Sequence, residues 1–329
     1  MSKWTLSDLP DQSGRTVIVT GASSGLGLIV ARELAAAGAS VVLAVRDVVK
    51  GREVAAQMSG RTEVRELDVC DISSVRRFAA AWSGPIDVLV NNAGIMEVPL
   101  ARTADGFESQ FATNYLGPFV LTGLLLPHIT DRVVSVSSQL HRMGKVHLDD
   151  LNAADRPYKA STAYNDSKLA EVLFSLELQR RLDAAGSPVR SLVAHPGIAS
   201  TNLARHAASG KVTHALRFLF NDPATGALSI LYAATQDVPG NSYIGPRGLG
   251  GMKGHPAPGT AASAGRDTDT AQRLWAATET LLAATTNPTA TATATATART
   301  STATPSSSST PHPASAWGSR RGFRPPATG

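Results

Sequence analysis

The sequence predicts an α/β fold, in which one doubly wound parallel sheet carries helices on both faces. Three observations lead to this prediction. Runs of strand length alternate with segments of helical length six times along the chain. One run, Ser40–Val45 (SVVLAV), is apolar throughout, as expected of a parallel strand covered on both sides. Glycines and polar residues gather just after the runs, where such sheets bind ligands.

The first half of the chain supplies four strands. A strand at Arg15–Thr20 runs through a glycine turn into a helix that reaches Ala37, and Gly38 ends it. The remaining elements of this half follow the same alternation. They are a strand at Ser40–Val45, a helix at Val48–Met58, a strand at Glu63–Leu67, a helix at Ile72–Trp82 and a strand at Ile86–Val90.

The second half continues the pattern with longer connections. Residues 105–129 have apolar residues at helical spacing, with a bend expected at Gly117-Pro118. Residues 139–160 are polar and irregular. The other expected elements are a strand at Arg132–Ser137, a helix at Thr162–Leu182, a strand at Val189–Ala194, helical segments within 199–240 broken at Gly210 and Pro223, a short strand at Tyr243–Pro246 and a helix at Asp269–Ala284.

Composition divides the 329 residues into a polar lead-in (1–14), a folded domain (15–284) and a low-complexity tail (285–329) expected to be disordered. The net charge of +5 does not describe the folded domain, because the tail holds four arginines and no acidic residue. Subtracting them leaves about +1 for the domain. We therefore expect no nucleic-acid partner.

The single cysteine, Cys70, rules out a disulfide framework and favours a cytoplasmic protein. The N-terminus has no apolar segment of signal-peptide length, and no run reaches the roughly 18 residues of a membrane span. We expect a soluble protein without a membrane partner. His141, His147, His195 and His206 lack metal-ligand spacing, so no metal is predicted.

The stretch Thr20–Gly27 (TGASSGLG) joins the first strand to the first helix. In that context Gly21 allows a tight turn, Gly25 lets backbone N–H groups approach a pyrophosphate, and Gly27 allows close helix packing. The helix N-terminus attracts the anion. Ser23, Ser24 and Leu26 complete the predicted dinucleotide-binding loop.

Tyr164 and Lys168 lie four residues apart in a predicted helix, and therefore on one face. A tyrosine with its ordinary pKa near 10 is a poor base, but a nearby ammonium favours the phenolate. Tyr164 would then exchange a proton with an alcohol or carbonyl oxygen, and the Ser138 hydroxyl would hold that oxygen. Alone, such a pair is more often a half-buried aromatic ring beside a solvated charge.

Together these motifs resemble the short-chain dehydrogenase/reductases from about Arg15 to Ala284. TGASSGLG, NNAG (91–94), Asn114, Ser138, YNDSK (164–168) and Pro196-Gly197 occur in that family's order. The resemblance implies a Rossmann-type sheet of strand order 3-2-1-4-5-6-7. It also implies catalytic roles, with Tyr164 as proton donor or acceptor, Lys168 as its electrostatic partner and ribose contact, Ser138 orienting the substrate oxygen and Asn114 holding a relay water.

The same resemblance assigns the remaining cofactor contacts. Asn92, Ala93 and Gly94 would line the adenosine side, and Pro196, Gly197 and Ile198 would lie near the nicotinamide. Asp68 and Val69 would bracket the adenine, or merely end a strand. Arg46 follows the second strand, where an acidic residue would favour NAD, so a guanidinium there favours NADP(H) over NAD(H). Arg46 as a solvated cation, or Asp47 repelling a phosphate, are the opposing interpretations.

Longer stretches (132–152, 163–182, 195–203 and 243–256) resemble the retinol-dehydrogenase-like branch, as does the gap of 26 residues (164 − 138) between Ser138 and Tyr164. Membrane-bound members carry an apolar N-terminal anchor that is not found here. Leu216, Phe218 and their apolar neighbours either cover a lipophilic substrate or pack as a helix. Relatives are often dimers or tetramers, so a homodimer or homotetramer is expected.

The leading hypothesis is an NADP(H)-dependent oxidoreductase acting on a small-molecule carbonyl or alcohol. A non-catalytic NADP(H) sensor or scaffold on the same fold is the first alternative, since it would need the glycine loop but not the four catalytic residues. A C=C reductase related to protochlorophyllide reductase is the second.

Overall fold

The computed structural model describes residues 3–197, 222–248 and 251–286. Met1–Trp275 forms one compact unit, which contains the whole sheet and the candidate site. The second unit begins at Ala276, inside the last helix, and is described as far as Thr286. The predicted Ile198, Gly210, Leu216 and Phe218 lie outside the described residues.

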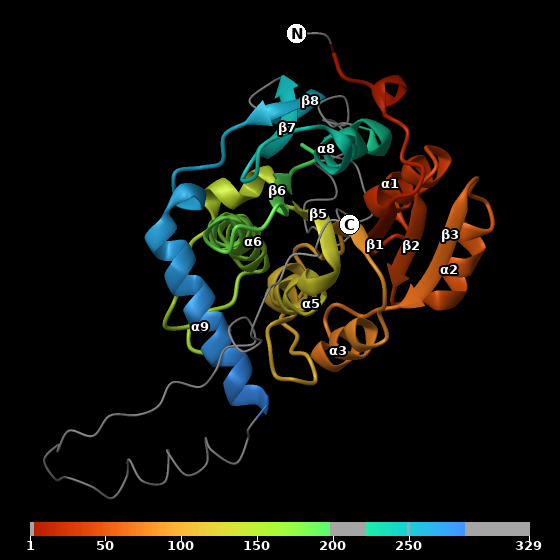
Figure 1. Cartoon of the computed structure of the whole chain (residues 1–329). Helices are drawn as coiled ribbons and strands as arrows, with labels where there is room; N and C mark the ends of the chain where they lie inside the picture. Colours follow the sequence, from red (N-terminus) through yellow and green to blue (C-terminus); the bar gives the residue numbers. More distant parts are fainter. Residues whose placement is uncertain (1–2, 198–221, 249–250, 287–329) are drawn as a thin grey trace, which may run out of the picture. The chain divides into compact units, whose positions relative to one another are not determined.

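The described residues form an eight-stranded sheet in the order β3-β2-β1-β4-β5-β6-β7-β8 (Figure 1). The pairs from β3 to β7 are all parallel. This confirms the doubly wound fold and the order expected from the resemblance. The strands are β1 (Thr16–Thr20), β2 (Ser40–Val45), β3 (Arg61–Glu66), β4 (Ile86–Asn91), β5 (Ile129–Val136), β6 (Arg190–Ala194), β7 (Tyr243–Gly248) and β8 (Lys253–Gly259).

Strand β8 adds to the roughly seven strands expected, and it pairs antiparallel with β7. Its sequence, KGHPAPG, holds two prolines and two glycines, which disfavour strands in isolation. At the edge of a sheet, however, a proline without an N–H can lie on the unpaired side. Strand pairing to β7, and not local preference, therefore accounts for this element.

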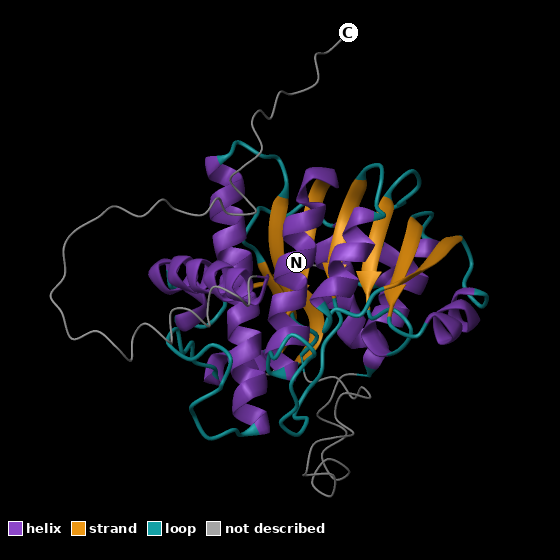
Figure 2. Ribbon diagram, turned by 90° about the horizontal axis from the view of Figure 1, so that it is seen from below, coloured by secondary structure: helices purple, strands orange, loops and turns teal. Residues whose placement is uncertain are grey.

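Helices cover both faces of the sheet (Figure 2). Helices α1 and α8 pack against each other on one face, and α3, α5 and α6 lie on the other (Figure 1). The longer helices are α1 (Gly25–Ala36), α2 (Val48–Ala55), α3 (Ile72–Ala80), α5 (Gly117–Leu125), α6 (Ala160–Ala184), α8 (Pro223–Thr235) and α9 (Thr268–Thr286). The short turns are η1 (Leu6–Asp8), α4 (Ser109–Phe111), η2 (Ala112–Leu116), η3 (Leu126–His128), η4 (Gln139–Met143) and η8 (Ala264–Arg266).

The single long helix expected over residues 105–129 is divided in the structure. The first helical turn, α4, starts only after Glu108, whose carboxylate accepts hydrogen bonds from the backbone N–H groups of Gln110 and Phe111. A π-helical turn, η2, follows, and α5 begins at Gly117 with Pro118 in its first turn. Gly117 is needed there because a Cβ would lie 2.0 Å from the carbonyl oxygen of Val69.

The main core lies between the sheet and the pair α1 and α8. Val17, Leu34, Leu43 and Ile230 are fully buried in it, as expected of strands covered on both faces. Burying one such side chain contributes about 1.5–3 kcal/mol. On the other face Trp275 lies 4.7 Å from Phe119 and 5.8 Å from Phe174 between ring centroids.

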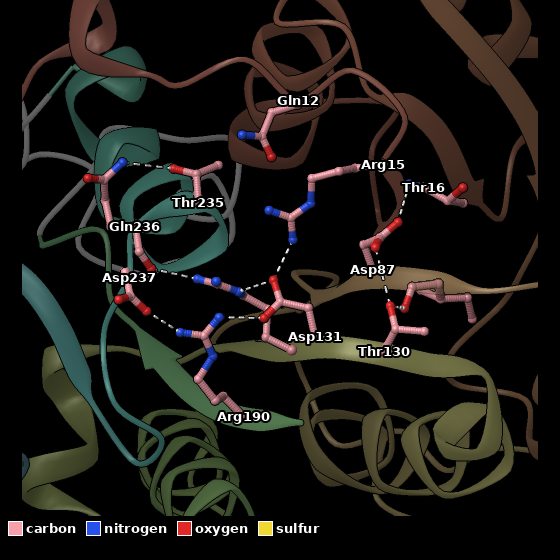
Figure 3. A network of polar contacts seen from close by, with 12 residues as sticks. Gln12, Arg15, Thr16, Asp87, Thr130, Asp131, Arg190, Thr235, Gln236 and Asp237 are labelled. Atoms are coloured by element: carbon pink, nitrogen blue, oxygen red, sulfur yellow. Dashed lines mark hydrogen bonds and ion pairs between the residues drawn. The ribbon is translucent and has the colours of Figure 1, made fainter. Parts of the chain in front are cut away.

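A polar network joins the N-terminal ends of three parallel strands (Figure 3). Asp131 on β5 accepts hydrogen bonds from Arg15, Arg132 and Arg190. Arg132 is buried and also donates to the carbonyl oxygens of Ala233 and Gln236. Since parallel strands start at this edge, the network holds the sheet together at the end opposite the predicted site.

Candidate active site

The glycine loop after β1 has the geometry that close packing demands. Gly21 and Gly25 adopt left-handed backbone angles, with φ of 67° and 57°. A Cβ on Gly27 would lie 2.4 Å from Asn92 Nδ2, so only glycine fits there. A Cβ on Gly25, in contrast, would meet no atom within 4 Å, so the loop faces open space at that point.

Helix α1 starts at Gly25 with its N-terminus at this open face. Ser24 is its N-cap residue but makes no capping hydrogen bond with its side chain. The first N–H groups of a helix have no partner within the helix and carry partial positive charge. Ser23, Ser24 and Leu26 are half-buried around them. The loop therefore fits an anionic pyrophosphate.

Thr20 connects the glycine loop to the end of β4, a role the sequence reasoning did not assign to it. Its hydroxyl accepts hydrogen bonds of 2.9 Å from the backbone N–H groups of Asn92 and Ala93. The Asn92 side chain donates to the Thr20 carbonyl oxygen at 2.8 Å. These three bonds fix the NNAG turn beside the loop.

Arg46 lies exposed at the C-terminal end of β2, free of the core. The Asp47 carboxylate caps helix α2, because its Oδ1 accepts a hydrogen bond of 3.0 Å from the Lys50 N–H. Asp68 is half-buried after β3 and accepts from the Cys70 N–H, and Val69 is buried. The structure brings these residues to the same sheet edge as the glycine loop.

Tyr164 and Ser138 meet at the C-terminal end of β5. The Tyr164 side chain is 5% exposed, and the Ser138 hydroxyl lies close enough to its phenol to influence its ionisation. Burial raises the pKa of Tyr164, while the Lys168 charge and the Ser138 hydrogen bond act to lower it. Ser138 is held in turn as the N-cap of η4, where its Oγ accepts from the Leu140 N–H.

Lys168 lies one helical turn beyond Tyr164, with its ammonium nitrogen 6.0 Å from the centre of the Tyr164 ring. The ammonium donates to the Val136 carbonyl oxygen and to Glu171 Oε2, both at 2.8 Å. It also reaches the NNAG turn, because a Cβ on Gly94 would lie 3.6 Å from Lys168 Nζ. Glu171 is a residue that the sequence reasoning missed, although its i+3 spacing from Lys168 was readable.

Asn114 lies fully buried in the π-helical turn η2, a geometry frequent at functional sites. Its side chain accepts from the Ile95 N–H at 2.9 Å and donates to the Ile95 carbonyl oxygen and to Ser167 Oγ. The amide thus joins the segment after NNAG to helix α6. The relay water expected at Asn114 stays a prediction.

Pro196 and Gly197 are half-buried after β6, and Gly197 has a φ of 73°. The Gly197 N–H donates to His195 Nδ1 at 3.3 Å. Burial lowers the pKa of His195 to about 3, so this imidazole is neutral. His195 therefore orders the turn that follows β6.

His141 is a further residue that the sequence reasoning left without a role. Its Nε2 accepts a hydrogen bond of 3.0 Å from the Ala262 N–H, so the ring proton is on Nδ1. Nδ1 then donates to the Ser138 carbonyl oxygen at 2.7 Å. Burial lowers the pKa of His141, which preserves this neutral form. The imidazole holds the backbone of Ser138 in place.

The fold and the site together define a class of protein: an α/β protein with a glycine loop at a helix N-terminus and, at the same sheet edge, a buried tyrosine and lysine beside a half-buried serine. The sequence profile of the short chain dehydrogenase family matches residues 15–211. This chain belongs to the short-chain dehydrogenase family, and it is an NAD(P)-dependent dehydrogenase or reductase.

Two curated relatives and one solved structure resemble most of the chain. Polyprenol dehydrogenase of Mus musculus is 42% identical over 288 residues, which are 82% of this chain and 84% of the relative. Retinol dehydrogenase 13 of Homo sapiens is 38% identical over 286 residues, 80% and 83% of the two chains. An uncharacterized protein from Mycobacterium paratuberculosis superposes with a TM-score of 0.76 at 52% identity, covering 85% and 97%.

The described residues hold neither a cluster of metal ligands nor a helix that could cross a membrane. Within those ranges no three His, Cys, Asp or Glu side chains are placed to share a metal ion. In the same part of the chain, no helix combines the length and the apolar character needed to traverse a lipid bilayer.

Proposed function

We propose that this chain is an NADP(H)-dependent oxidoreductase that moves a hydride between nicotinamide and a carbonyl or alcohol carbon, with Tyr164 as the proton donor or acceptor. The observation that supports it best is the buried Tyr164 phenol beside the Ser138 hydroxyl, with the Lys168 ammonium 6.0 Å from the centre of its ring. A phenol beside a cation and a hydroxyl is suited to proton exchange with an oxygen atom.

Each side chain has a separate task in this proposal. The bound cofactor supplies or accepts the hydride. Ser138 donates a hydrogen bond to the substrate oxygen, and Tyr164 gives that oxygen its proton during reduction or removes it during oxidation. Lys168 keeps a positive charge beside the phenolate that results. Burial around Tyr164 excludes water, which strengthens these interactions.

The residues of the sheet edge fit the cofactor. The N–H groups at the start of α1 would hold the pyrophosphate beside Gly21, Ser23 and Gly25. Asp68, Val69 and the NNAG turn would hold the adenosine half, and Pro196 to Ile198 the nicotinamide half. Asp47 is engaged as the cap of α2, which supports Arg46 as the contact for a 2′-phosphate and hence NADP(H).

The substrate in this proposal is a lipophilic alcohol or its carbonyl form. The names of the two curated relatives support it, because polyprenol and retinol are both apolar alcohols. We further propose a cytoplasmic protein made of domain 15–284 with a low-complexity tail, assembled as a homodimer or homotetramer. Light scattering of the purified chain measures that assembly directly.

A panel of lipophilic aldehydes, ketones and alcohols, assayed with NADPH and NADH, tests the function. We expect NADPH oxidation with at least one carbonyl compound, or NADP⁺ reduction with its alcohol. Binding of NADPH without turnover on any member of the panel would contradict the proposal, and would instead indicate a non-catalytic sensor.

A further inference from the structure

Lys168, the partner of Tyr164, also forms a buried ion pair with Glu171. Lys168 Nζ and Glu171 Oε2 are 2.8 Å apart, and their side chains are only 5% and 2% exposed. Both residues belong to helix α6, at i and i+3, so helical geometry places their side chains on one face. The ammonium has three N–H bonds, of which one goes to Glu171 and one to the Val136 carbonyl oxygen.

The negative charge of Glu171 raises the pKa values of both Tyr164 and Lys168. Burial alone would lower the pKa of Lys168, but the charge and the hydrogen bond of Glu171, together with the charge of Tyr164, outweigh burial and the pKa is raised. Burial raises the pKa of Glu171 to about 7 against the opposing effect of Lys168, so the carboxyl is mostly charged above neutral pH, where Tyr164 and Lys168 lose their protons. Burial has the largest effect on the pKa of Tyr164 and raises it. Lys168 and the Ser138 hydroxyl act to lower this pKa, and Glu171 and Glu97 act to raise it.

A buried lysine without a partner tends to lose its proton, since burial in a low dielectric penalises the charged form. A neutral amine at Lys168 would no longer stabilise a phenolate at Tyr164. Burying a charged carboxylate beside it is also costly, and is offset only by close pairing. The 2.8 Å contact supplies that pairing at the one lysine whose charge the reaction needs.

We propose that Glu171 is a positioning residue for the reaction: its carboxylate holds the Lys168 ammonium against the Val136 carbonyl oxygen and keeps it charged, so that Tyr164 is the member of the pair that exchanges its proton. This inference rests on the proposed function and deepens it. The pH range in which the enzyme works is then set in part by a carboxylate that does not touch the substrate.

Glu171→Gln isolates the charge, because the amide oxygen can still accept the hydrogen bond from Lys168. Tyr164 and Lys168 titrate as a coupled pair. Removing a nearby negative charge makes proton loss from either one easier. We therefore expect both limbs of the pH profile of kcat/KM to move to lower pH, by about one unit.

A second measurement needs no cofactor or substrate. The phenolate absorbance of each protein, minus that of its Tyr164→Phe counterpart, reports the ionisation of Tyr164 alone among the five tyrosines. We expect the midpoint of this difference titration to be lower in Glu171→Gln than in the wild type. A structural role that merely supports helix α6 would not move it.

Glu177→Gln is the matched control. Glu177 lies on the same helix, is 1% exposed and is paired with Arg180 and Arg181. We expect it to lower stability and to leave the pH profile unchanged. Glu171→Asp keeps the charge and should retain a profile close to that of the wild type. If Glu171→Gln does not fold, the smaller Glu171→Asn serves as the neutral variant, with the same shift expected.

The outcomes separate this inference from the proposed function. Suppose that the wild type turns over, and that the neutral Glu171 variants have the same pH profile and titration midpoint as the wild type. This result would overturn the role of Glu171 and leave the proposed function standing. An equal shift in Glu177→Gln would overturn it as well. Absence of turnover in the wild type would instead contradict the proposed function, and the cofactor-free titration would still report on Glu171.

Discussion

Lys168 Nζ donates a hydrogen bond of 2.8 Å to the carbonyl oxygen of Val136, the last residue of β5. The bond joins the helix that carries Tyr164 to the strand that leads into Ser138. Ser137 strengthens the same junction, since its hydroxyl donates to the Lys168 carbonyl oxygen at 2.9 Å. Phenol, ammonium and hydroxyl are therefore held by the fold before any ligand binds.

Arg46→Ala should change cofactor preference. If the guanidinium pairs with a 2′-phosphate, its removal raises the KM for NADPH roughly tenfold or more and leaves the KM for NADH unchanged. Steady-state kinetics with both cofactors measure the ratio. Arg32→Ala, on the exposed side of α1, is the control. Equal KM changes for the two cofactors would argue that Arg46 is only a solvated cation.

Gly27→Ala should damage the cofactor loop. The added Cβ would lie 2.4 Å from Asn92 Nδ2 and 2.7 Å from the Gly21 carbonyl oxygen. Relieving that overlap costs about 1–3 kcal/mol of stability and moves the loop. We expect roughly tenfold weaker NADPH binding, or about 1.4 kcal/mol, measured by fluorescence titration. Wild-type affinity in this variant would mean that the loop does not contact the cofactor.

Local signals predict the alternation of strands and helices and the one helix face that Tyr164 and Lys168 share, whereas the strand order followed from the family resemblance. Strand β2 is apolar along its length, and Tyr164 and Lys168 meet because they are one helical turn apart. Strand β8 could not be predicted in the same way, since KGHPAPG becomes a strand only by pairing with β7. The division of the 105–129 segment depends on Glu108 acting as a cap, which its sequence context does not reveal.

Buried charges were the other feature that local patterns could not show. Arg132, Glu108 and Glu171 are almost fully buried, yet each reads as a surface residue in the sequence. Arg132 finds its carbonyl partners, such as that of Ala233, only in the folded structure, whereas the N–H groups that Glu108 caps and the Lys168 partner of Glu171 lie within three residues along the chain. The hydrogen bonds of Thr20 to the NNAG turn likewise join segments about seventy residues apart, as the separations of 72 and 73 residues show.

Asp131→Asn should destabilise the sheet at the edge away from the site. Burial by itself would raise the pKa of Asp131, but Arg190 and Arg132 outweigh it and the pKa is lowered. A carboxyl with a lowered pKa stabilises the fold above its ordinary pKa of about 4, and this contribution is lost as pH falls through the folded-state value. The charge-dependent part of that stability is therefore present at neutral pH.

Urea unfolding should show that Asp131→Asn lowers the free energy of unfolding by about 1–3 kcal/mol at pH 7. This difference from the wild type should become smaller below about pH 4. Asp237, which also pairs with Arg190, is fully exposed, and Asp237→Asn is expected to change nothing measurable. A difference that does not depend on pH would contradict the charge-based explanation.

Trp275→Ala should lower the stability of the compact unit without affecting the chemistry. Its ring is 1% exposed, stacks on Phe174 at 15° and lies under the Arg181 guanidinium. Deleting such a side chain costs about 3–5 kcal/mol. Trp275→Phe should recover part of this loss. Thermal unfolding measures both, and an unchanged midpoint for Trp275→Ala would show that this contact does not support the fold.

The measurement that tests the central claim most directly is turnover by Tyr164→Phe, made alongside its NADPH affinity. Phenylalanine keeps the ring and removes only the hydroxyl that exchanges the proton. We predict that kcat falls by about 10²–10⁴-fold while NADPH binds nearly as before, and that Tyr232→Phe, on α8, turns over at the wild-type rate. Undiminished turnover in Tyr164→Phe would contradict the assignment of Tyr164 as the proton donor or acceptor.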